Sequence, residues 1–226
     1  MIQSPSSFYR QNRKPVSVYT TYGCTIKSCF IYLHKIYDMT FDDITDDGRL
    51  WAVRYDGEDD NALFGLFEQW NDVSWLRSFF KENISDLSLY FKMTDVNRAI
   101  CATIDDAEKL QCLMMDMSSA GELDKIFRPL ETQRTSDGLL GKEKARLRRE
   151  IRRPSWLRIY AIKLSAGVYI VTGGAIKLTG TMNEREHTLL ELRKLEMVRT
   201  FLLEEGIVDN EGFIEYLSEA SYGRTY

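Results

Sequence analysis

The residues best suited to chemistry in this sequence lie in its C-terminal half. Arg158 and Lys177 can hold an anion, and Tyr160 follows Arg158 by two positions, so both face one side of a predicted strand. A polar loop further along carries Arg185 and His187, and His187 is the side chain best suited to exchange a proton near neutral pH. These residue types indicate a site for an anionic partner.

Charge is unevenly distributed along the 226 residues, although the net charge is only −4. Residues 1–38 carry five Lys/Arg and one acidic residue, and residues 39–131 carry nine Lys/Arg and twenty acidic residues. Residues 132–163 reverse this balance with ten Lys/Arg and three acidic residues, whereas residues 164–226 have six and ten. A basic band between acidic blocks predicts either an anionic partner or neutralisation by the acidic half. Its densest run contains Lys142, Lys144, Arg146, Arg148, Arg149, Arg152 and Arg153.

The elements that must position these residues can be predicted from local patterns. Residues 142–153 are predicted to form a basic helix, which Pro154 ends. Residues 156–164 and 168–172 are rich in β-branched and aromatic residues around a short turn, which predicts a hairpin. Gly173 and Gly174 predict a bulge, after which the strand is expected to resume over residues 175–179.

The flanking segments predict helices packed on this sheet. Apolar spacing predicts helices over residues 62–70 and from Asp72 onwards, preceded by a strand over 49–55. Residues 98–103 are expected to form a short strand before a helix that follows. Thr188 and Glu191 match the capping box of a long C-terminal helix.

Together these elements predict an α+β fold, an antiparallel sheet with packed helices. We expect three regions: a poorly ordered segment over 1–38, an acidic α+β region over 39–131, and residues 132–226 with the basic helix, hairpin and C-terminal helix. Four cysteines without a CxxC pair, and two histidines, favour reduced thiols and no metal site. No apolar run reaches the roughly 18–20 residues that span a bilayer. We therefore expect a cytoplasmic protein without a membrane segment.

The hairpin region resembles the core of RelE/ParE-superfamily toxins over about residues 140–205. The similarity is carried by Leu157-Arg158-Ile159-Tyr160, Val168-Tyr169-Ile170-Val171, Ile176-Lys177-Leu178-Thr179 and Glu184-Arg185-Glu186-His187-Thr188. The chain is more than twice the usual length of such toxins, and its acidic N-terminal block has no counterpart in them. The resemblance implies a bacterial toxin–antitoxin protein with a RelE-like core, an acidic N-terminal extension and an antitoxin partner.

The resemblance also implies a mechanism, because nuclease members cut messenger RNA on the ribosome without a metal or other cofactor. Arg158 and Lys177 would supply positive charge, and His187 would act as acid or base. Tyr160 would stack on a base or position the phosphate, and Arg185 would orient the scissile phosphate. The basic run over 142–153 would contact ribosomal RNA through its phosphates.

Structural roles remain open for several of these residues. His187 can be a solvated residue at a helix start, Lys177 an edge-strand lysine, and Arg158 the partner of an acidic side chain. The basic run can be a solvated helix face. Two other functions also remain open: a non-catalytic member of the same fold, such as the gyrase-inhibiting ParE type, or an inhibitor that binds a basic or nucleic-acid-processing partner through the acidic N-terminal region.

Overall fold

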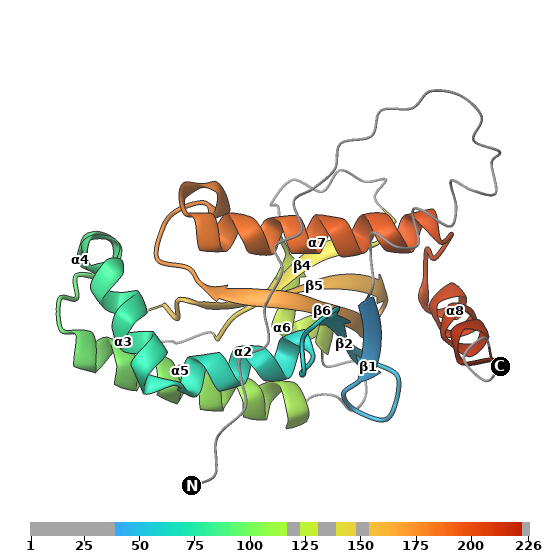
Figure 1. The fold of residues 1–226 in the computed structure, drawn as a ribbon, viewed down its shortest axis with the longest axis horizontal. Helices are drawn as coiled ribbons and strands as arrows, with labels where there is room; N and C mark the ends of the chain where they lie inside the picture. The colour runs from blue at the N-terminus through green and yellow to red at the C-terminus, as the bar shows by residue number, and fades with distance from the viewer. Residues whose placement is uncertain (1–38, 117–122, 131–138, 148–153, 223–226) are drawn as a thin grey trace, which may run out of the picture. The chain divides into compact units, whose positions relative to one another are not determined.

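A computed structural model describes residues 39–116, 123–130, 139–147 and 154–222, all within one compact unit. The fold is α+β, as predicted, with helices on both faces of a six-stranded sheet (Figure 1). In chain order the elements are β1 (Met39–Asp43), β2 (Leu50–Tyr55), α2 (Ala62–Asn71), α3 (Val73–Glu82), α4 (Ile84–Phe91), α5 (Val96–Asp116), α6 (Leu123–Ile126), β3 (Phe127–Pro129), β4 (Gly141–Ala145), β5 (Leu157–Ser165), β6 (Val168–Ile176), the 3₁₀ turn η1 (Met182–Glu184), α7 (Glu186–Glu204) and α8 (Asn210–Tyr222).

The sheet has the strand order β1-β2-β6-β5-β4-β3. Neighbouring strands are antiparallel except β2 and β6, which run parallel and pair over only three positions, from Leu50–Tyr169 to Ala52–Val171. The predicted hairpin is confirmed as β5 and β6, with a register shift between Tyr160 and Ala161. Because β2 pairs with β6 only at its beginning, the later residues of β6 are paired through β5 alone.

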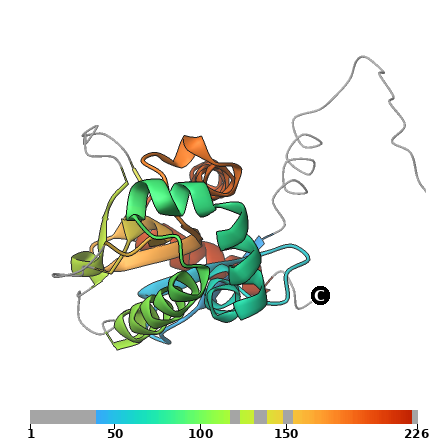
Figure 2. The same cartoon turned by 90° about the vertical axis from the view of Figure 1, so that its left-hand side faces the viewer.

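Helices lie on both faces of the sheet (Figure 2), and each face has its own hydrophobic core. Helices α2, α3 and α5 cover one face, where Trp156 is fully buried and donates from Nε1 to the Thr103 hydroxyl at 2.9 Å. Helices α7 and α8 cover the other face. Each fully buried Leu or Phe contributes about 1.5–3 kcal/mol of burial free energy, so both cores hold the sheet firmly. The second core includes Val53, Tyr160, Ile162, Ile170, Leu195, Val198 and Phe213.

Helices α2 and α3 form as their apolar spacing and caps predict. Asn61 accepts hydrogen bonds from the Leu63 and Phe64 amides, and Asp72 accepts from Ser74 and Trp75. The apolar stripe of α2 is buried against the sheet. This packing fixes the direction of α2 across the unpaired end of β6.

The predicted helix over 142–153 is wrong where the structure describes it, because Gly141–Ala145 is strand β4. Glu143 and Ala145 are buried on one face, whereas Lys142 and Lys144 point to the other. β4 pairs with β3 on one side and β5 on the other, and this pairing outweighs the helical propensity of the charged residues. Residues 148–153 lie outside the described residues.

Three smaller predictions are also corrected. Residues 98–103 belong to helix α5, because Ala99, Ile100 and Thr103 continue its buried stripe. Strand β6 ends at Ile176 and does not extend over residues 177–179. Helix α7 begins at Glu186, so Thr188 lies inside it, and the capping box is formed instead by Thr181 and Glu184 at η1.

The regions predicted as 39–131 and 132–226 contribute to the same sheet. β1, β2 and β3 come from the first region, and β4, β5 and β6 from the second. The acidic region therefore supplies one parallel neighbour of the hairpin, β2, and the helices of one face. Residues 1–38, predicted to be poorly ordered, lie outside the described residues.

Candidate functional site

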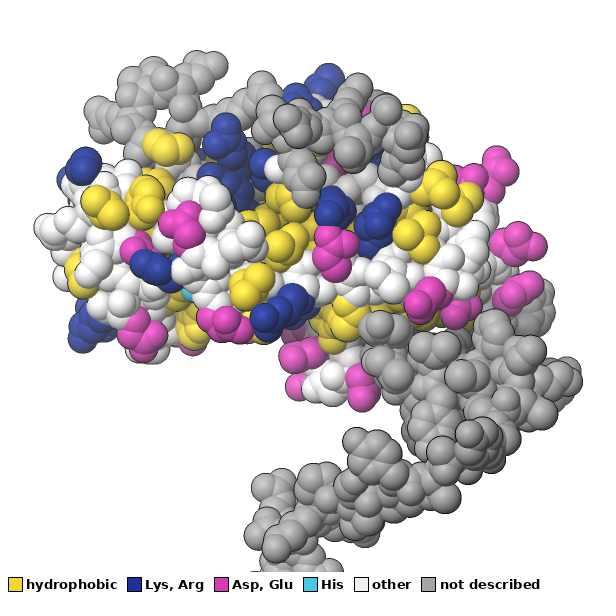
Figure 3. Space-filling model, turned by 90° about the horizontal axis from the view of Figure 1, so that it is seen from above, with side chains coloured by type: hydrophobic (Ala, Val, Ile, Leu, Met, Phe, Trp, Pro, Cys, Tyr) yellow, Lys and Arg dark blue, Asp and Glu magenta, His cyan; other side chains and the backbone are white. Residues whose placement is uncertain are grey.

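Four basic side chains gather at one end of the sheet, on the face covered by α7. Lys144 lies on β4 opposite Tyr160, Arg158 lies on β5, and Lys177 directly follows β6. Arg146 follows β4. We call Lys144, Arg146, Arg158 and Lys177 the basic cluster. Three neighbouring strands position it, and Lys and Arg side chains gather beside α7 in the view of that face (Figure 3).

Within the described residues, the members of this cluster form no ion pair within 4 Å, and Lys144, Arg158 and Lys177 donate instead to backbone carbonyls. Lys144 Nζ donates to Leu130 O at 2.8 Å, and Lys177 Nζ donates to Thr179 O and Gly180 O. Arg158 donates through Nη1 to the Ser155 and Leu157 carbonyls. Its Nε and Nη2 groups make no hydrogen bond to a described residue, so part of the guanidinium remains available for an anion.

The positive charges of the basic cluster repel one another, and partial burial adds to the cost of keeping them charged. Burial and the charge of Arg146 lower the pKa of Arg158 to about 10. Burial lowers the pKa of Lys177, and Arg158 lowers it further. The pKa of Lys144 is lowered by burial and by the charges of Arg158 and Arg146. An anion bound among these side chains would relieve the mutual repulsion.

Lys142, also predicted to bind nucleic acid, lies on β4 two residues from the cluster. Its ammonium pairs with Glu196 of α7 at 2.5 Å. This ion pair connects β4 to α7. It neutralises the positive charge of Lys142, which we expected to contact an RNA phosphate. The remaining predicted residues, Arg148, Arg149, Arg152 and Arg153, lie outside the described residues.

Tyr160 is fully buried beneath α7 and does not offer a ring for base stacking. Its hydroxyl has no hydrogen-bond partner among the described residues. Burial raises the pKa of Tyr160, and the nearby charge of Arg158 opposes that increase. Tyr160 therefore belongs to the core beside the cluster.

The side chains of Arg185 and His187 contact other residues and do not belong to the basic cluster. Arg185 forms a two-point ion pair with Asp86 of α4. His187 Nε2 lies 3.0 Å from Ile176 O, and because a carbonyl only accepts, Nε2 carries the proton in this contact. The imidazole also packs edge-on against Phe79 at 5.2 Å. Of the five residues predicted as a catalytic set, the structure brings Arg158 and Lys177 together.

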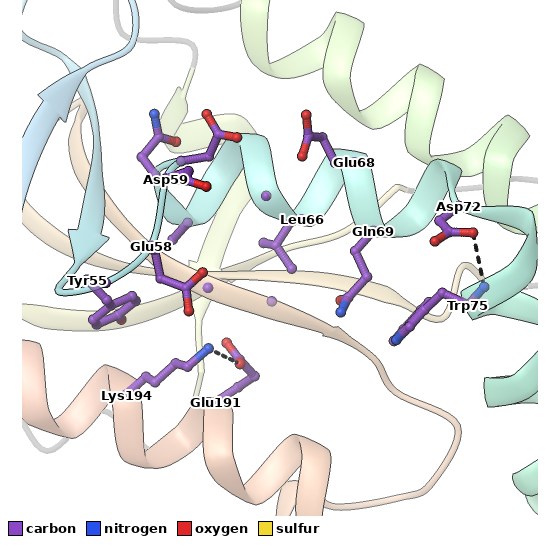
Figure 4. A pocket seen from close by; sticks show the side chains of 17 residues that line it. Tyr55, Glu58, Asp59, Leu66, Glu68, Gln69, Asp72, Trp75, Glu191 and Lys194 are labelled. Atoms are coloured by element: carbon purple, nitrogen blue, oxygen red, sulfur yellow. Dashed lines mark hydrogen bonds and ion pairs between the residues drawn. The ribbon is translucent and has the colours of Figure 1, made fainter. Parts of the chain in front are cut away.

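A second site lies where β6 parts from β2, between α2 and α7 (Figure 4). It is a pocket of about 760 Å³ that opens beside an apolar pocket of about 540 Å³. Gly174 and Glu191 line both. The sequence pattern around Glu191 indicates only a helix cap and does not predict this site, although the Gly173-Gly174 pair in a strand signals a close approach to the backbone.

The aspartates at the end of β1 and in the β1–β2 turn bind nearby groups of the same hairpin. Asp43 accepts from the Thr45 and Gly48 amides, and Asp42 pairs with Arg54. Asp47 accepts from Thr45 and from the Arg49 amide. In the described part of the chain, no group of three or more His, Cys, Asp or Glu side chains could hold a metal ion.

Comparison with known proteins gives no further assignment: no family model, curated protein or solved structure matches this chain. Among the described helices, none is both long and apolar enough to cross a membrane.

Proposed function

We propose that this protein is a toxin-like component of a toxin–antitoxin system that binds RNA through the basic cluster. The observation that carries the proposal is the convergence of Lys144, Arg146, Arg158 and Lys177 from three strands, without an ion-pair partner among the described residues. The resemblance of the β5–β6 hairpin to RelE/ParE toxins supports RNA as the anion. Its antitoxin would cover this cluster when the toxin is silent.

Cleavage of messenger RNA on the ribosome is the activity that the resemblance implies. Arg158 and Lys177 would stabilise the charge that develops on the phosphate when the 2′-hydroxyl attacks it. The described contacts of His187 are with Phe79 and Ile176 O, so the acid–base part of this proposal needs a rearrangement or a group supplied by the ribosome.

The test is inducible expression in bacteria of the wild type beside the double variant Lys144→Gln, Lys177→Gln. The control is Arg98→Gln, Lys109→Gln, which removes the same charge from α5 on the opposite face of the sheet. We expect growth arrest and cleaved messenger RNA from the wild type and the control, and relief in the cluster variant.

Arrest with intact RNA would favour a ParE-like target instead. Absence of arrest from folded wild-type protein would contradict the toxin proposal and favour the alternative, a non-catalytic protein that binds a basic partner through its acidic region. The observation that favours this alternative is the acidic lining of the pocket between α2 and α7.

A further inference from the structure

Tyr90 presents an exposed aromatic ring near the end of α4. The residue is 47% exposed, and Phe64 of α2, at 41%, is the other exposed aromatic residue among those whose side chains the structure describes. Helix α4 lies beside η1 and the start of α7 in both ribbon views (Figure 1, Figure 2). Tyr90 therefore offers a flat apolar surface to a ligand at this end of the molecule.

The polar tip of Tyr90 is bound within the protein. Tyr90 Oη donates to Glu184 Oε2 at 3.2 Å, and Thr181 Oγ1 donates to the other oxygen of Glu184 at 2.9 Å. Arg185, the next residue along the chain, is fixed by its ion pair with Asp86 of α4. A side chain that is positioned before binding loses less conformational entropy when a ligand packs on it.

The exposed ring borders the basic cluster. Lys177 Nζ donates to Gly180 O, directly before Thr181. Hydrogen bonds from Thr181 lower the pKa of Glu184. The Tyr90 hydroxyl and the positive charge of Lys177 lower this pKa further. Tyr90 and Lys177 therefore both lie close to the Glu184 carboxylate.

Positive charge beside an exposed ring suits a single strand of nucleic acid. Lys and Arg side chains bind the phosphates, and unpaired bases stack on aromatic rings. In a double helix the base faces are covered by their neighbours, so a protein ring can stack only on a base outside the helix. Tyr160, the residue predicted to stack on a base, is fully buried, whereas Tyr90 is accessible.

We propose that Tyr90 is the base-stacking platform of the RNA site. A single strand places a phosphate among Lys144, Arg158 and Lys177, and a neighbouring base lies on the Tyr90 ring. This inference rests on the proposed function, RNA binding at the basic cluster, and defines the substrate as an unpaired strand. Because every base has an aromatic face, stacking at Tyr90 tolerates different sequences.

The test is fluorescence anisotropy of the full chain with a labelled single-stranded RNA oligonucleotide. Tyr90→Ala should raise the dissociation constant about fivefold or more, because the stacking of a base on the ring is lost. The slope of log K against log salt should stay that of the wild type, since no phosphate contact is removed. Tyr90→Phe keeps the ring and should bind as the wild type does.

An abasic oligonucleotide of the same length separates stacking from an indirect effect. It keeps the phosphates and lacks the bases, so Tyr90→Ala should bind it as the wild type does. An equal loss of affinity for both oligonucleotides would show that Tyr90 acts on the cluster through Glu184, and would overturn the stacking proposal.

The matched control is Phe64→Ala, which removes the other exposed ring from α2 on the opposite face of the sheet. It should leave the dissociation constant unchanged, and a loss equal to that of Tyr90→Ala would overturn the proposal. If Lys144→Gln with Lys177→Gln weakens binding but Tyr90→Ala does not, stacking at Tyr90 is overturned while the cluster stands. If the wild type binds no RNA, the proposed function fails and this inference fails with it.

Discussion

Arg185 and Asp86 form a two-point ion pair that joins the start of α7 to α4, across 99 residues of sequence. Nε and Nη2 of Arg185 each lie 2.6 Å from a different oxygen of Asp86. The Asp86 side chain is only 8% exposed, whereas that of Arg185 is 46% exposed. The pair therefore satisfies a buried carboxylate with a partner from the surface.

Replacing Arg185 with alanine should lower the melting temperature, because it leaves the Asp86 carboxylate buried without its partner. We expect a decrease of about 2–4 °C. The control is Arg193→Ala, which breaks an exposed pair with Glu186 at 3.5 Å on the same helix and should change the melting temperature little. Equal effects of the two substitutions would show that the buried pair has no special role.

RNA binding at the basic cluster should be strongly salt-dependent. Each phosphate contact to single-stranded RNA contributes about 0.7 to the slope of log K against log salt. Lys144→Gln combined with Lys177→Gln should therefore reduce the slope by about 1.4, as measured by fluorescence anisotropy with a labelled oligonucleotide. Arg98→Gln with Lys109→Gln should keep the wild-type slope, and an equal reduction in both variants would point to diffuse charge.

Glu191 should make folding stability depend on pH. Burial raises its pKa in the folded protein, and Lys194 and the Gly174 amide offset part of that increase. A raised folded pKa favours the protonated form, so this stabilisation is complete below the unfolded value of 4.5 and is lost as pH rises through the folded pKa.

The glutamine variant isolates this effect, because it cannot ionise. Thermal unfolding of the wild type and of Glu191→Gln should be compared from pH 4 to pH 8. Relative to the wild type, Glu191→Gln should gain stability as pH rises above about 4.5 and then level off. A difference that is constant with pH, or that grows in the opposite direction, would contradict the raised pKa.

Gly174 should not tolerate a side chain. A Cβ there would overlap the Arg158 carbonyl oxygen and lie 2.8 Å from Leu66 Cδ1. Because this carbonyl belongs to the neighbouring strand β5, it cannot move without disturbing the pairing of β5 with β6. Gly174→Ala should therefore lower the free energy of unfolding by about 1–3 kcal/mol, as measured by chemical denaturation.

Gly65 in α2 offers the opposite case. Nothing lies within 4 Å of a Cβ at that position. Gly65→Ala should stabilise the protein by about 0.5–1 kcal/mol, because alanine favours the helix. Similar effects of the two substitutions would rule out steric overlap at Gly174 as the cause.

Local pattern alone predicted much of the fold. Helix α2 follows from apolar residues at helical spacing and the β5–β6 hairpin from β-branched strands around a turn, since these signals depend on near neighbours. The same signals failed for β4, where Lys142 to Ala145 suit a helix or a strand equally, and only pairing with β3 and β5 decides.

The sites depended far more on tertiary structure. The sequence determined that basic residues are concentrated in one band and indicated Arg158 and Lys177 as candidates, because charge and residue type are local. It could not place Arg185 on Asp86, since the two meet only when α4 packs near the start of α7. Nor could it place the Glu191 carboxylate against Gly173, because that contact arises where α7 crosses the open end of β6 opposite α2.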